Sequence, residues 1–178
     1  MRRIIAVGGA VVAVLVIGVL AFAAIQPDTF RIQRATSIKA PPEKIYGHID
    51  NLRAQSTWSP WEKKDPAMKR AFSGALRGKG AVYEWDGNNE IGKGRIEITD
   101  LSPPSKVTMK IDFVRPFEGH NVVEFTLEPK GEVTNVTWAM RGPQPLIGKI
   151  ISVFIDCDKM VGREFEAGLA NLKAIAER

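Results

Sequence analysis

The stretch Ile150 to Arg178, IISVFIDCDKMVGREFEAGLANLKAIAER, shows a helical hydrophobic pattern. At about 100° per residue, one apolar stripe centred on Phe154 runs through it, with all members within roughly 60° of that centre. Its other members are Ile147, Ile150, Ile151, Cys157, Val161, Phe165, Gly168, Leu169, Leu172, Ile175 and Ala176. The pattern predicts one long helix from Leu146 to about Ala176 that buries a single face.

Two acidic residues in this segment fall on different sides of the predicted helix. Asp156 lies about 160° from the centre of the stripe, so we expect it to be exposed and replaceable by Asn. Asp158 lies about 40° from the centre and is the only charged residue in the stripe. Asp158 therefore either pairs with a basic side chain or backbone amide, or orients the polar head of a ligand.

An alternating segment provides the partner for this helix. From Met68 to Arg141 the hydrophobic period is two, with frequent Gly and Pro, which predicts six consecutive antiparallel strands. Thr29 to Ile38 adds an earlier strand. The predicted inward side chains are Tyr83, Trp85, Ile96, Ile98, Val107, Met109, Ile111, Phe113, Val123, Phe125, Leu127, Val136, Trp138 and Met140.

Two short helical segments are expected between the first strand and the others. Pro41 and Pro42 suit a helix start, and apolar residues follow at helical spacing. A second helical turn or loop contains Trp58 and Trp61. The predicted fold is therefore α+β, with a curved antiparallel sheet of about seven strands wrapped on the long C-terminal helix.

The N-terminal segment is expected to cross a membrane. Ile4 to Ile25 is 22 residues without a charge, enough to span a hydrocarbon core. Arg2 and Arg3 favour a cytoplasmic N-terminus. We therefore predict a single-pass anchor, residues 1–27, in the inner (cytoplasmic) membrane, and a domain, residues 28–178, on the periplasmic or extracellular side. A cleaved signal peptide is the alternative, because Ala21 to Ala23 is an A-x-A site.

Composition excludes several classes of function. The chain has 25 Lys and Arg against 20 Asp and Glu, and Arg2 and Arg3 belong to the anchor, so nucleic acid is not an expected partner. Only His48 and His120 are available as imidazoles, and neither has metal-ligand spacing, so we predict no metal and no cofactor. His120, beside Gly119 in a connecting segment, is a candidate rim residue.

Four motifs carry a resemblance to a known family. They are APPEKIYGHIDN (residues 40–51), WSPWEKKDPAMKRAFSG (58–74), GAVYEWDGNNEIGKGRIEI (80–98) and DKMVGREFEAGLANLK (158–173). With the order of elements, they resemble the SRPBCC or START-like superfamily, and more narrowly its bacterial polyketide cyclase/dehydrase and lipid-transport proteins. The likeness covers about Arg31 to Lys173 and implies a helix-grip fold with a cavity between the sheet and the last helix.

The resemblance implies a site for a lipid or another hydrophobic small molecule in that cavity. The candidate cavity residues are Trp58, Trp61, Tyr83, Trp85, Phe113, Phe117, Phe125, Trp138, Phe154 and Asp158, although core packing alone explains most of these aromatic rings equally well. An enzyme of the cyclase or dehydrase type is the alternative, with Asp158 as acid or base and Tyr83 as proton donor. A third possibility is an envelope interaction module with a basic patch of Lys63, Lys64, Lys69, Arg70, Arg77 and Lys79.

Overall fold

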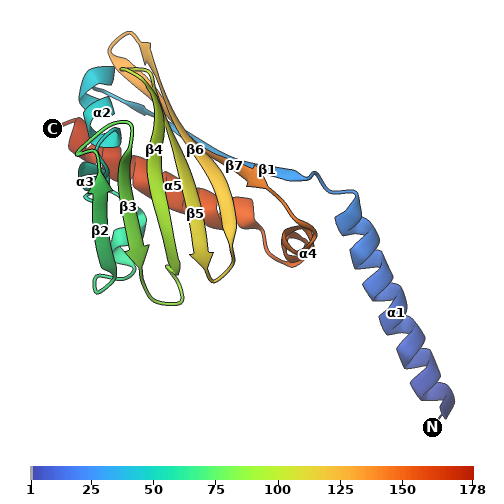
Figure 1. Cartoon of the computed structure of the whole chain (residues 1–178). Coiled ribbons are helices and arrows are strands. Elements are labelled where there is room, and N and C mark those ends of the chain that lie inside the picture. The colour runs from blue at the N-terminus through green and yellow to red at the C-terminus, as the bar shows by residue number, and fades with distance from the viewer. Residues whose placement is uncertain (1) are drawn as a thin grey trace.

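A computed structural model describes the backbone of residues 2–178 and the side chains of residues 13–178. A long N-terminal helix is followed by one domain in which a curved sheet wraps around the C-terminal helix (Figure 1). The elements are α1 (Arg2–Ala24), β1 (Thr29–Ile38), α2 (Pro42–Ile49), α3 (Leu52–Gln55), the 3-10 helix η1 (Pro60–Lys63), β2 (Lys69–Gly74), β3 (Ala81–Asp86), β4 (Lys93–Ser102), β5 (Lys106–Arg115), β6 (Gly119–Lys130), β7 (Val133–Pro143), α4 (Leu146–Phe154) and α5 (Cys157–Ala176).

The sheet confirms the predicted antiparallel meander. Its seven strands lie in the order β1-β7-β6-β5-β4-β3-β2, so the first strand closes one edge by pairing with the last. On β5, for example, Val107 and Met109 are fully buried, whereas Lys110 is exposed. This alternation turns one face of the sheet toward α5.

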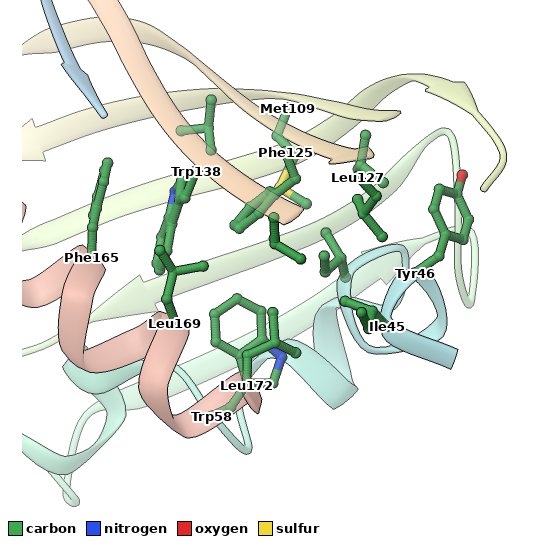
Figure 2. Packing of buried hydrophobic residues seen from close by; sticks show 14 of the residues in the cluster. Ile45, Tyr46, Trp58, Met109, Phe125, Leu127, Trp138, Phe165, Leu169 and Leu172 are labelled. Atoms are coloured by element: carbon green, nitrogen blue, oxygen red, sulfur yellow. The ribbon is translucent and has the colours of Figure 1, made fainter. Parts of the chain in front are cut away.

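The core lies where the C-terminal half of α5 meets the sheet. The rings of Trp138 and Phe165 are stacked, with centroids 4.3 Å apart and planes 7° apart (Figure 2). Trp58 is 1% exposed, meets Trp138 edge-on at 5.6 Å, and donates its indole N–H to the carbonyl of His48 at 3.0 Å. Leu169 and Leu172 complete the same layer of contacts from α5. These contacts join sheet, helix and the α2–η1 region into a single core.

The predicted continuous C-terminal helix is wrong, because the chain breaks it in two. Ile155 is extended, with φ −125° and ψ 120°. The carboxylate of Asp156 accepts a hydrogen bond from the backbone N–H of Lys159 at 2.9 Å and thereby caps the N-terminus of α5. The apolar pattern continues across the break, but α4 does not continue the direction of α5 (Figure 1). Phe154, the centre of the predicted stripe, is consequently 73% exposed.

The N-terminal helix α1 extends away from the domain (Figure 1). Residues 4–12 of the predicted membrane span lie outside the described side chains. Within the part of the chain that was searched, no helix is both long and apolar enough to cross a membrane.

Two glycines test the closeness of the helix and the sheet. A Cβ on Gly168 would lie 2.6 Å from the Trp138 ring and 3.1 Å from Pro60 Cδ, whereas one on Gly47 in α2 would meet nothing within 4 Å. Overpacking costs about 1–3 kcal/mol, against roughly 1 kcal/mol gained by alanine over glycine in a helix. In urea unfolding, Gly168→Ala should therefore destabilise the protein, whereas Gly47→Ala should stabilise it. A stabilised Gly168→Ala variant would contradict the close contact.

Candidate hydrophobic cavity

A cavity of about 370 Å³ lies between the concave face of the sheet and the first half of α5. Strands β3 to β7, the segment from α3 to η1 and the first turns of α5 supply its wall. The deep end contains the buried side chains of Met109, Phe125 and Phe165. The exposed lining residues are Glu90, Arg115, Pro116, Phe117 and Met160. The mouth is therefore bordered by the β3–β4 hairpin, the β5–β6 hairpin and the start of α5.

Seven of the ten candidate cavity residues form part of this wall. They are Trp61, Tyr83, Trp85, Phe113, Phe117, Phe125 and Trp138. Alternation along the strands explains the common direction of the five that lie on strands, and Trp61 of η1 and Phe117 of the β5–β6 connection complete the set. Gly94 leaves the room that the Trp85 ring occupies across β3 and β4. Phe117 is 70% exposed and lies at the mouth of the cavity.

The other three candidates lie elsewhere. Trp58 is packed in the core behind the cavity. Phe154 belongs to α4, which the break at Ile155 turns away from the sheet. Asp158 lies in the first turn of α5 but its side chain reaches the edge strand β1. We therefore remove these three residues from the proposed site.

The carboxylate of Glu62 lies in the cavity wall, and both of its oxygens accept hydrogen bonds. Tyr83 donates its hydroxyl hydrogen to Glu62 Oε1 at 2.6 Å, and Arg70 Nε donates to Glu62 Oε2 at 2.7 Å. Burial first, and the Glu62 carboxylate second, raise the pKa of the Tyr83 phenol far above its ordinary value. Tyr83 therefore stays neutral, and its proton is engaged by Glu62 rather than directed at the cavity.

Two polar residues that sequence reasoning missed remain open to a ligand. The Gln55 amide nitrogen has only a weak contact with Met109 Sδ at 3.8 Å. Ser59 directly precedes η1, and its side chain makes no capping hydrogen bond there. Both residues line the cavity and are one helical turn apart in the chain. They give an otherwise largely apolar wall one uncharged polar spot.

Arg34 of β1 explains the position of Asp158. Its guanidinium donates to both carboxylate oxygens of Asp158, at 3.2 and 2.9 Å, and to Glu166 Oε1 at 2.8 Å. Gly162 lies between these two acids on the same face of α5, and the guanidinium occupies the space that a Cβ would need there. The observed pairing agrees with the prediction that Asp158 pairs with a basic side chain. It does not agree with the prediction that Asp158 acts as an acid or base inside the cavity.

Comparison with protein families gives a match over residues 29–177 to the family described as polyketide cyclase / dehydrase and lipid transport. The chain belongs to this family. The match covers β1 through the end of α5 and thus the whole helix-grip unit of the SRPBCC superfamily. The comparison with curated proteins found no match.

Solved structures share the fold at low sequence identity. Protein CV1439 from Chromobacterium violaceum is 18% identical with a TM-score of 0.60, over 86% of this chain and 99% of that one. The Aha1 dimer from Colwellia psychrerythraea is 21% identical, with a TM-score of 0.59, over 83% and 96%. Ginseng major latex-like protein 151 from Panax ginseng is 15% identical, with a TM-score of 0.58, over 85% and 100%. These likenesses establish the fold of the family domain.

The Arg34–Asp158 pair should make stability depend on pH in a defined direction. The hydrogen bonds from Arg34 lower the pKa of Asp158 in the folded protein. The pair therefore stabilises the fold above the unfolded pKa of this carboxyl, and that contribution disappears as pH falls through the folded pKa. In thermal melts, Asp158→Asn should lower the Tm modestly at neutral pH, and the difference from the parent should close in acid.

Asp156→Asn is the matched control for this experiment. Asn caps helices about as well as Asp, so the control should melt close to the parent at every pH. A difference between Asp158→Asn and the parent that stays constant with pH would show that the lost charge is not the cause.

Proposed function

We propose that the domain binds an apolar small molecule, or an apolar part of a lipid, in the cavity between the sheet and α5. The observation that carries this proposal is a cavity with an apolar wall and an exposed rim inside an otherwise well-packed domain. Its volume of about 370 Å³ is near the lower end of small-molecule pockets, about 300–1,000 Å³. This size favours one small molecule or a single apolar chain over an entire two-chain lipid.

The charges and polar groups narrow the chemistry of the ligand. The carboxylate of Glu62 lines the wall, so an anionic group is disfavoured there. Gln55 and Ser59 instead provide uncharged hydrogen-bonding groups beside Met109 and its apolar neighbours. We therefore propose a largely apolar ligand that carries a hydroxyl or carbonyl group. Arg115 at the mouth is already paired with the Asp86 carboxylate and adds no free positive charge for an anionic substituent.

We also propose that α1 anchors the domain in the inner or cytoplasmic membrane, with residues 28–178 on the periplasmic or extracellular side. The support for this proposal is the uncharged run from Ile4 to Ile25 and the preceding Arg2 and Arg3. From Val14 to Phe22, the described part of α1 exposes large apolar side chains. An apolar helix without a core to bury it is best accommodated by lipid.

The structure favours ligand binding over an envelope interaction module. In the proposed basic patch, Lys64 is paired with Glu90 and Glu164, Arg70 with Glu62, and Arg77 with Asp50. These partners neutralise half of the six residues and reduce the attraction of the patch for an acidic partner.

Filling the cavity tests the binding proposal. Every member of the buried core cluster lies between Ile32 and Ala176, so residues 26–178 retain the whole cluster and are used for this experiment. Val123 lines the cavity, whereas Val122, its neighbour on β6, faces the opposite side of the sheet. Val123→Trp should abolish the fluorescence enhancement of the neutral apolar dye N-phenyl-1-naphthylamine, because the indole occupies its space.

Val122→Trp is the matched control, since it adds the same volume outside the cavity. Thermal melts of both variants show whether each is folded, and the smaller change Ile111→Phe at the cavity wall replaces Val123→Trp if the latter unfolds. Equal dye binding by folded parent, Val123→Trp and Ile111→Phe proteins would overturn the proposal.

The polar spot can be tested with a pair of ligands. A long-chain alcohol and the alkane of equal length differ only in the hydroxyl group that Gln55 would bind. A hydrogen bond contributes about 0.5–1.5 kcal/mol, so Gln55→Leu should weaken alcohol binding roughly 2- to 12-fold. Competition with the dye should show unchanged or tighter binding of the alkane. An equal loss for both ligands would mean that Gln55 only shapes the cavity.

A further inference from the structure

The helix α4 and the cavity mouth expose an unusual number of large apolar side chains. The exposed fractions are 61% for Ile147, 73% for Phe154 and 70% for Phe117, and Leu146, Ile155 and Met160 are also exposed. Met160 and Phe117 are rim residues of the cavity, and the others belong to α4 or directly follow it. Single exposed apolar residues are common on soluble proteins, but a group of this kind indicates an interaction surface.

The only charged residue of α4 is directed away from this surface. Lys149 donates to Asp28 Oδ1 at 2.7 Å, and its side chain is 8% exposed. Asp28 lies in the short segment between α1 and β1, and its carbonyl accepts a hydrogen bond from the backbone N–H of Gln144. Two contacts to Asp28 therefore hold α4 beside the start of the domain, with an outer face that carries no charge.

The apolar surface of α4 adjoins that of α1. The two helices are in contact, and Ala23, in the last turn of α1, is fully buried. Leu20 and Phe22 at the same end of α1, and Ile25 directly after it, are exposed. Figure 1 shows α4 between the C-terminal end of α1 and the beginning of α5. An environment that covers this end of α1 therefore also reaches α4.

We propose that the outer face of α4, together with Met160 and Phe117, docks on the surface of the lipid bilayer that holds α1. This inference rests on the proposed anchoring by α1 and adds an orientation to it. The docked domain turns its mouth toward the lipid, so that an apolar ligand passes between bilayer and cavity without crossing water. Amphipathic helices in other proteins bury their apolar faces in the interface between lipid headgroups and acyl chains.

A bilayer fits this surface better than a second protein chain. The continuity with α1 places lipid next to α4 at all times once α1 is inserted, which makes contact effectively intramolecular. Lys159 in the first turn of α5 adds an exposed cationic group beside the apolar side chains. Such groups suit anionic headgroups at the border of an inserted apolar patch.

Depth-dependent quenching in the full-length protein tests the proposal. Cys157 is the only cysteine, so a Cys157→Ala background accepts a single new cysteine at Phe154 for labelling with the fluorophore NBD. The labelled protein is reconstituted into phosphatidylcholine and phosphatidylglycerol vesicles that contain a lipid with a nitroxide near the headgroup. Lys130→Cys is the control, because β7 separates this turn from α4 by about 35 Å at 3.3 Å per residue.

We expect strong quenching of the label at position 154 and little quenching at position 130. Equal, weak quenching at both positions in protein that floats with the vesicles would overturn docking by α4 and leave anchoring intact. Full-length protein that does not float with vesicles would instead refute the anchoring. The fluorescence of the label at position 154 could instead change with protein concentration and not with the nitroxide lipid. That result would assign the surface to a second copy of the chain.

Discussion

The pairing of Arg34 with Asp158 and Glu166 fixes where α5 lies relative to the sheet. Arg34 belongs to β1, where it is paired in register with Trp138 of β7, and its guanidinium crosses α5 at Gly162. The helix is thereby attached to the edge strand of the sheet at its N-terminal half. A helix held at the edge does not need to lie against the middle of the sheet, so a space can persist below it.

The two halves of α5 consequently meet the same concave sheet in different ways. From Phe165 onward, Gly168 lets the helix approach until Trp138 stacks on Phe165, and Leu169 and Leu172 are buried against the sheet. Before Phe165, Met160 and Val161 line the cavity from the helix, and Phe113 lines it from the sheet. Packing at one end supplies the stability of the domain, and incomplete packing at the other supplies a place for a ligand.

Sequence reasoning predicted the sheet well and the site only in part, for reasons that particular residues make clear. Alternation in β5 is a local property, so Val107 and Met109 reveal the inward face without knowledge of other strands. The break before Asp156 was missed because the apolar pattern continues through it while a side-chain cap starts a new helix. That break turned Phe154 away from the sheet. Asp158 keeps its predicted position on the sheet-facing side of α5, where it meets Arg34 of the edge strand instead of the cavity. Gln55 has no pattern that distinguishes a cavity residue from a loop residue, so only the three-dimensional structure could identify it.

The cavity and the outer face of α4 are both places where apolar surface is left without a partner from the protein. Each lowers stability relative to a sequence that fills the space near Val123 or replaces Phe154 by a polar residue. Such substitutions are simple, and stabilising changes are usually easy to find in natural proteins. Two unfavourable apolar surfaces, one inside the domain and one on α4, therefore fit a common purpose. Under the proposed docking, an apolar molecule that enters the domain at Phe117 and Met160 comes from the bilayer that contacts α4.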